Sequence, residues 1–121
     1  MSYELELISL RCRDAQEGKD ETYLMVNGHL QWGPTGMRTG NTRTIGRRVS
    51  FDHDVRVDLR ESDRRRVPHR KDDHFGTMQL DEREVRGLIR GDRHLLTHTF
   101  HRDRGIAGDA RYTLTYDLHR T

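Results

Sequence analysis

Val55-Arg-Val-Asp-Leu-Arg60 alternates apolar and charged side chains without a break. Alternation with a period of two is typical of a β-strand that has one buried face and one face in water. The same pattern returns near the end of the chain, over residues 111–118, where every second residue is Tyr or Leu. Both stretches therefore predict two-faced strands of a sheet that covers a core.

The first strand pattern changes phase part-way along. Tyr3, Leu5 and Leu7 alternate with glutamates, and the apolar positions then move to Ile8, Leu10 and Cys12. One extra residue on a strand produces such a shift, so the sequence predicts a β-bulge near Leu7.

Turn signals separate the remaining strand patterns. Asn27-Gly28 is the strongest hairpin signal, and it lies between predicted strands at residues 22–26 and 29–32. The Gly- and Thr-rich stretch from Gly33 to Gly46 is expected to include a mobile loop at residues 34–41. Asp81 to Gly87 predicts one or two helical turns that end at the glycine. Further strands are predicted at residues 48–51, 75–80, 95–100 and 111–118.

About eight short strands with almost no helix predict an all-β fold, an antiparallel sandwich. The length of 121 residues fits a single domain over residues 1–121. The net charge of +2 results from 22 basic and 20 acidic residues, and so small an excess gives no reason to expect a nucleic-acid partner. Nearly all the basic residues are arginines, which we attribute mainly to genomic base composition. The oligomeric state stays open.

The cellular location is predicted from what the sequence lacks. The N-terminus has no basic segment followed by an apolar one, so no signal peptide is expected. No run approaches the roughly 20 apolar residues of a transmembrane helix. The single cysteine, Cys12, excludes an intramolecular disulfide and is expected to be a small buried side chain. We therefore expect a cytoplasmic protein without a transmembrane segment.

Two acidic loops carry the functional signal. The first, Asp14-Ala-Gln-Glu-Gly-Lys-Asp-Glu21, leads directly into a strand at Tyr23. The second opens with Glu61-Ser-Asp63 and closes with Asp72-Asp-His-Phe-Gly76. Carboxylates at alternate positions, with glycine where the backbone turns sharply, suit a hard cation with oxygen ligands such as Ca²⁺. If the two loops meet at one end of a sandwich, their carboxylates form one site.

This order of motifs resembles a C2 domain, an eight-stranded β-sandwich that binds Ca²⁺ through loops at one end. Asp14 matches the aspartate of the family's first loop, and Asp20 with Tyr23 is similar to the aspartate that precedes an aromatic strand start. The run from Val55 to Asp63, followed by residues 72–76, is similar to a later strand and loop. The resemblance covers residues 3–80 and is that of a distant, bacterial-type branch. It implies an antiparallel eight-stranded C2-like β-sandwich with Ca²⁺ ligands among Asp14, Asp20, Glu61, Asp63, Asp72 and Asp73, Asp72 being an alternative to Asp73.

The second loop departs from the family pattern in two ways. Glu61 stands where the family usually has aspartate, and the insertion from Arg64 to Lys71 is strongly basic. Three interpretations of the acids stay open: Ca²⁺ binding, internal neutralisation by residues 64–66, and solvated surface acids that pair loosely with arginines. The basic insertion is also a candidate surface for an acidic protein or an anionic lipid surface. A protein partner is favoured, because only Val67 and Pro68 offer apolar contacts.

A second class of function is a small β-sandwich or β-barrel enzyme, or a ligand-binding protein, that acts on a small molecule without Ca²⁺. Glu61 with His74 would be its general-base pair, and its cavity would be lined by Tyr23, Trp32, Tyr112 and Tyr116. His69 and His74 could also join a softer metal site, whereas His98 and His101 are expected on opposite faces of one strand. The chain has no HExxH, CxxC, P-loop or GxSxG motif.

Overall fold

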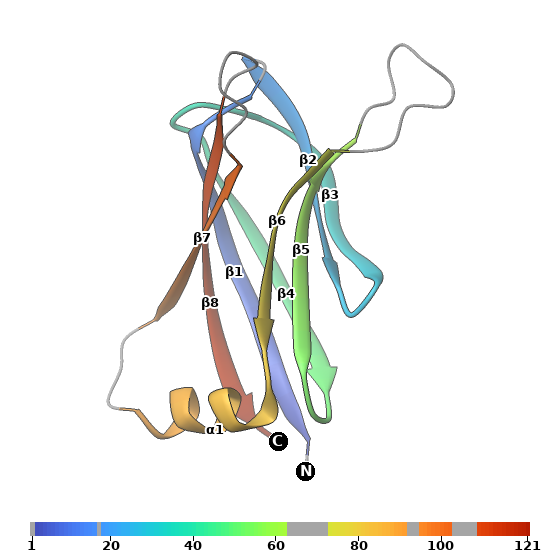
Figure 1. Ribbon diagram of the computed structural model, residues 1–121, viewed down its shortest axis with the longest axis vertical. Helices are drawn as coiled ribbons and strands as arrows, with labels where there is room; N and C mark the ends of the chain where they lie inside the picture. Colours follow the sequence, from blue (N-terminus) through green and yellow to red (C-terminus); the bar gives the residue numbers. More distant parts are fainter. Residues whose placement is uncertain (1, 17, 63–72, 92–94, 103–108) are drawn as a thin grey trace.

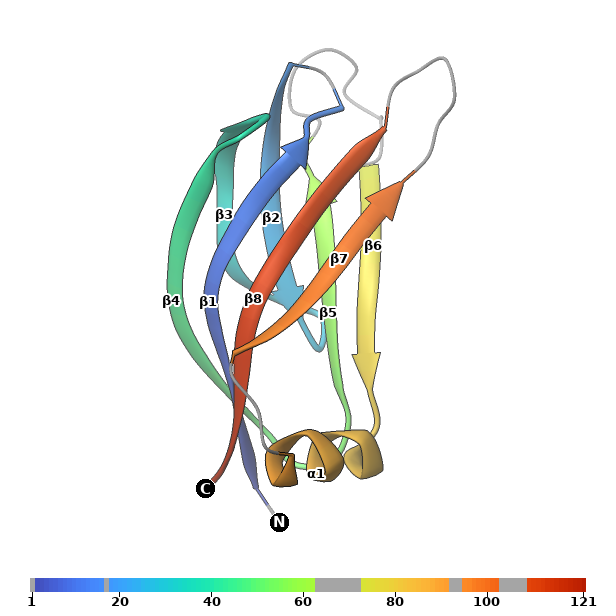
Figure 2. The ribbon, with the colours of Figure 1, turned by 90° about the vertical axis from the view of Figure 1, so that its left-hand side faces the viewer.

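The computed structural model describes residues 2–16, 18–62, 73–91, 95–102 and 109–121. Within these residues, eight strands form two four-stranded sheets that pack face to face, with one helix at an end of the sandwich (Figures 1 and 2). The elements are β1 (Tyr3–Asp14), β2 (Lys19–Val26), β3 (His29–Arg38), β4 (Thr42–Phe51), β5 (Val55–Glu61), β6 (Asp73–Leu80), α1 (Glu82–Arg90), β7 (Leu96–Arg102) and β8 (Ala110–Arg120).

The strand orders are β4-β1-β8-β7 in one sheet and β3-β2-β5-β6 in the other. Every neighbouring pair is antiparallel, so the predicted antiparallel eight-stranded β-sandwich is confirmed. The alternating apolar residues of both sheets point inward and are buried, as predicted for Tyr112, Leu114, Tyr116 and Leu118 of β8. Phe75 of β6 stacks on Tyr112 across the core, with ring centroids 5.7 Å apart.

The predicted phase change in β1 is present. The pairing of β1 with both of its neighbours shifts register between Leu7 and Ser9, which is the expected bulge. The shift returns Leu10 and Cys12 to the core, where both are buried. Burial raises the pKa of the Cys12 thiol, so this cysteine is a packing residue, as predicted.

The Asn27-Gly28 hairpin is confirmed, and both residues have the positive φ of a type I′ turn, 49° and 83°. The prediction of a mobile loop at residues 34–41 is wrong, because β3 continues to Arg38 and β4 begins at Thr42. Pro34 is tolerated since β3 is an edge strand, where a missing N–H costs no ladder bond on the outer side. Gly33 allows the close approach of β2, since a Cβ there would lie 2.4 Å from the Thr22 carbonyl oxygen.

The helix is longer than predicted. Asp81 caps its start, accepting a hydrogen bond from the Glu84 N–H at 2.8 Å, while the Glu84 side chain accepts from the Asp81 N–H. Gly87 does not end it; α1 runs to Arg90 and Gly91 follows as the C-cap. Burial of Val85 outweighs the low helix propensity of one glycine. No helix in the described ranges is long and apolar enough to cross a membrane.

Candidate functional site

The described acidic candidates lie at the end of the sandwich opposite α1 and the chain termini. There β1 ends and β2 begins, β5 ends and β6 begins, and β7 ends and β8 begins (Figures 1 and 2). The topology thus brings the described parts of the two acidic stretches to one end, although about 40 residues separate them in sequence. Asp63 and Asp72 lie outside the described residues, as does the basic stretch 64–71.

Three of the four described candidates are buried. Asp20 is fully buried, Glu61 is 5% exposed and Asp73 is 9% exposed, whereas Asp14 is exposed at the end of β1. Glu61 and Asp73 are direct cross-strand partners on β5 and β6, so their side chains point to the same face. Buried carboxylates need hydrogen-bond donors or cations around them, and the structure provides several.

Gln16 joins the two acidic segments. Its backbone N–H donates to Asp20 Oδ2 at 2.9 Å, and its side-chain Nε2 donates to Asp73 Oδ2 at 3.3 Å. The other amide atom of this side chain, Oε1, is buried and has no hydrogen-bond partner among the described residues. An oxygen acceptor is therefore left over beside two carboxylates, whereas most buried polar groups in proteins are hydrogen-bonded.

Asp20 and Asp73 have further partners on the opposite sheet. The Tyr112 hydroxyl donates to Asp20 Oδ2 at 2.5 Å, and burial together with this bond raises the pKa of Tyr112 far above its usual value. The Arg102 guanidinium lies 3.5 Å from Asp73 Oδ1 and also donates to the His74 carbonyl at 3.1 Å. The charge of Asp73 is therefore partly neutralised within the protein, by Arg102 of β7. The sequence had pointed instead to residues 64–66, which lie outside the described ranges.

Among the described residues Gln16, Asp20, Glu61 and Asp73, the candidate ligand atoms are carboxylate and amide oxygens, which is the set that hard cations prefer. The described carboxylate oxygens are not, however, drawn together into a closed cluster. Among the described residues, the group with three ligand atoms mutually within 4.8 Å is Glu6, Asp117 and His119, on a different part of the molecule.

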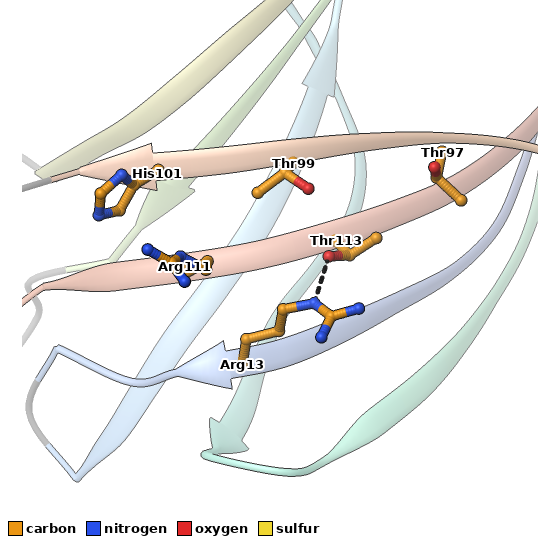
Figure 3. Close-up of a pocket in the computed structure, with 6 residues that line it drawn as sticks. All are labelled: Arg13, Thr97, Thr99, His101, Arg111 and Thr113. Atoms are coloured by element: carbon orange, nitrogen blue, oxygen red, sulfur yellow. Dashed lines mark hydrogen bonds between the residues drawn. The ribbon is translucent and has the colours of Figure 1, made fainter.

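A basic hollow of about 510 Å³ lies on the outer face of the β4-β1-β8-β7 sheet. Figure 3 shows Arg13 of β1, Arg111 of β8 and His101 of β7 around it, together with three threonines, Thr97, Thr99 and Thr113. Arg13 Nε donates to Thr113 Oγ1 at 2.8 Å, which ties the guanidinium to β8 (Figure 3). The hollow is open and polar, so it suits an anionic group at a surface better than an enclosed apolar ligand.

A further cluster of titratable groups centres on Asp58, on the outer face of β5. Its Oδ1 accepts from Thr77 Oγ1 at 2.6 Å and lies 3.1 Å from His74 Nε2, and Arg56 lies 3.1 Å from its Oδ2. Burial alone would raise the pKa of Asp58, but the bonds from Thr77, His74 and Arg56 together hold it below its usual range.

The predicted pair of Glu61 with His74 is not formed. Asp73 and Glu61 face inward, and the next residue, His74, points to the outer face, where it contacts Asp58 and Thr77. The Thr77 hydroxyl and the Asp58 carboxylate both approach the same atom of the His74 ring, Nε2. In a catalytic triad, the hydroxyl and the carboxylate each contact a different ring nitrogen. Of the expected cavity aromatics, Tyr112 and Tyr116 are core residues.

Comparison with solved structures identifies the fold. Extended-synaptotagmin 2, in a structure of a pair of its C2 domains, aligns over 95% of this chain and 40% of its own, with a TM-score of 0.51 and 17% identity. A calcium-bound structure of the same pair of domains gives a TM-score of 0.51 at 16% identity over 45% of that chain. Human GIVD cytosolic phospholipase A2 gives 0.53 at 14% identity, over 99% of this chain and 16% of its own.

The fold is C2-like. The chain spans less than half the length of each of these three structures. No protein-family model matches the sequence, and no curated protein matches it. At such low identities the likeness is one of fold, and it confirms the resemblance seen in the order of the sequence motifs.

Two features of the candidate sites in this C2-like domain escaped sequence reasoning. Gln16 lay inside the first acidic loop but carries no charge, so the carboxylate pattern passed over it. Arg13 and Arg111 stand on strands that are nearly 100 residues apart, and their proximity follows only from the pairing of β1 with β8. The alternation of apolar and polar residues indicates that an arginine on each strand faces outward. It does not indicate which two strands pair with each other.

Proposed function

We propose that the chain is a C2-like module that binds Ca²⁺ at the end where β1 meets β2 and β5 meets β6. The observation that carries this proposal is Gln16, which bonds to Asp20 and Asp73 and keeps a buried amide oxygen without a partner among the described residues. A spare buried oxygen beside two buried carboxylates fits a hard cation better than it fits a cluster closed on itself.

The ligands would come from both acidic segments. Asp20, Glu61 and Asp73 are the buried candidates, and Asp14, Asp63 and Asp72 complete the proposed set. Bound Ca²⁺ would supply positive charge that neutralises these carboxylates. Arg102 and the Tyr112 hydroxyl hold Asp73 and Asp20 in place from the opposite sheet, so the site is tied to both layers of the sandwich.

The role of the site would be structural or would be to engage an anionic or protein partner. The basic hollow supports the second role, because Arg13 lies next to Asp14 in sequence and Arg111 is the cross-strand partner of Asp14. A dication at the loop end would reverse the sign of the local potential beside these guanidinium groups. A partner with carboxylate or phosphate groups would then meet positive charge over the whole end.

The test is thermal unfolding of EDTA-stripped protein titrated with Ca²⁺ and, separately, with Mg²⁺. At 100 times its dissociation constant, a ligand that binds only the folded state adds about 2.7 kcal/mol, or several degrees in melting temperature. We expect a rise with Ca²⁺ and a smaller one with Mg²⁺, which demands a stricter octahedral shell. Asp20→Asn and Asp73→Asn should each abolish the rise.

Asp52→Asn is the matched control, because Asp52 is an exposed aspartate in the turn between β4 and β5. It should leave the Ca²⁺ response unchanged. The absence of any shift at millimolar Ca²⁺ would reject the metal site. A large loss of stability in metal-free Asp73→Asn, without any Ca²⁺ response in the wild type, would show that Asp73 serves the ion pair with Arg102 instead.

A further inference from the structure

A second cluster of metal-ligand side chains lies on the outer face of the sheet, far from the acidic loops. Glu6 of β1 faces Asp117 of β8 across the ladder, and His119 follows two residues later on the same face of β8. The Nε2 atom of His119 lies 3.3 Å from Glu6 Oε1 and 3.7 Å from Asp117 Oδ2. All three side chains are half-buried, and one ligand atom from each lies within 4.8 Å of the others.

The spacing of these atoms is that of ligands around one small ion. Zinc bonds of about 2.0–2.2 Å to nitrogen and oxygen place two tetrahedral ligands about 3.4 Å apart. The two separations from Nε2, 3.3 and 3.7 Å, bracket this value closely, and the two carboxylate oxygens lie within 4.8 Å of each other. A single ring nitrogen carries at most one proton, and it cannot satisfy two converging carboxylates equally well by hydrogen bonding alone.

The remaining oxygens of both carboxylates already have other partners. Glu6 Oε2 lies 3.7 Å from the Arg48 guanidinium of β4, and Asp117 Oδ1 accepts the Leu118 N–H at 2.9 Å. Each carboxylate therefore has one oxygen oriented by its surroundings, and its second oxygen points at the imidazole. Outer contacts of this kind orient metal ligands and fix their direction.

We propose that Glu6, Asp117 and His119 form a site for a divalent transition-metal ion, with Zn²⁺ as the fitting example. One imidazole and two carboxylates suit Zn²⁺ and its neighbours, whereas Ca²⁺ requires six to eight oxygen ligands. Water would complete the coordination, as it does at zinc sites that have three protein ligands. The ion bridges the first and last strands of the chain, so its effect is to clamp β1 to β8 near the two termini.

The experiment is calorimetric titration of EDTA-stripped full chain with ZnCl₂, together with the melting temperature at each Zn²⁺ concentration. The wild type should bind at least one Zn²⁺ per chain, and its melting temperature should rise as Zn²⁺ is added. His119→Ala should weaken this binding by more than the roughly 10–100-fold that loss of an outer contact costs, and should remove the rise. Glu6→Gln keeps the size of the side chain and should have the same effect.

His53→Ala is the matched control, because His53 lies 3.5 Å from a single carboxylate, that of Glu82. It should leave Zn²⁺ binding and the melting response intact. Equal losses in His119→Ala and His53→Ala would overturn the proposal, since Zn²⁺ would then bind histidines without regard to the cluster. Wild type that shows no Zn²⁺-dependent rise would overturn it as well, leaving His119 as an ion-pair partner only.

Discussion

Asp58 is an outward-facing carboxylate that its neighbours bury almost completely. Its ordinary pKa of about 3.9 applies to the unfolded chain, while bonds from Thr77, His74 and Arg56 lower the pKa in the fold. A lowered folded-state pKa means that the charged group stabilises the fold above the unfolded pKa. This contribution is lost as the pH falls through the folded-state value.

Thr77→Val removes the shortest of these bonds with little change in shape. A hydrogen bond to a charged group contributes about 1.5–3 kcal/mol, so urea unfolding at pH 7 should show a loss of that size. The difference between mutant and wild type should shrink as the pH falls from about 4, the pKa of an unfolded aspartate, through the lowered folded-state pKa of Asp58. Thr44→Val, at an exposed position of β4, should be nearly neutral at both pH values. A difference that stays constant with pH would mean that Thr77 acts through packing alone.

Single residues also show how much of the candidate site could be predicted from the sequence. Alternating acids with a following glycine predicted where carboxylates gather, and three of the four described ones are buried there. The pattern could not separate Asp14, which is exposed, from Asp20, which is buried, because burial depends on Tyr112 and Gln16. Nor could it find Glu6 and His119, which are 113 residues apart and meet only through the β1–β8 pairing.

At the scale of elements, the pairing of β1 with β8 creates the basic hollow, since Arg13 and Arg111 stand on the same face of neighbouring strands (Figure 3). A basic residue near an anionic membrane surface contributes about 1 kcal/mol. The double variant Arg13→Gln with Arg111→Gln should therefore weaken binding to phosphatidylserine vesicles by about 30-fold at low salt. Sedimentation with the vesicles in the presence of Ca²⁺ measures this change.

Arg83→Gln with Arg90→Gln is the control for that experiment, because both residues lie on α1 at the opposite end of the sandwich. It removes the same net charge and should leave vesicle binding nearly unchanged. Equal effects of the two double variants would show that only net charge matters. No binding of wild type to anionic vesicles at low salt would direct the search for an anionic partner to acidic proteins.

Strand periodicity located the strands, and the capping and glycine signals located α1. The end of β3, the start of β4 and the end of α1 were misjudged for the same physical reason. Glycine and proline signalled a loop at residues 34–41 and a helix stop at Gly87, whereas tertiary contacts retained the regular structure. In β3 the glycine permits close contact with β2, and the edge position tolerates proline. In α1 the buried Val85 anchors the helix to the core. Local propensity predicts what an isolated segment prefers, and packing decides between close alternatives.

At the scale of the whole molecule, the two proposed metal sites lie at different levels of the sandwich. Eight residues of β1 separate Glu6 from Asp14, which at about 3.3 Å per residue places them roughly 25 Å apart. Charges at the surface are screened over about 8 Å at physiological ionic strength, and the two sites share no ligand. Binding of Ca²⁺ at one site should therefore leave the affinity for Zn²⁺ at the other unchanged.

This independence is measured by titrating Zn²⁺ into EDTA-stripped protein with and without saturating Ca²⁺. The two dissociation constants for Zn²⁺ should agree within about twofold, because sites this far apart without common partners behave additively to about 0.5 kcal/mol. His119→Ala should abolish the Zn²⁺ response and keep that to Ca²⁺, and Asp73→Asn should do the reverse. If saturating Ca²⁺ instead eliminated the Zn²⁺ response, both ions would be competing for one set of carboxylates at the loop end, and the clamp between β1 and β8 would be excluded.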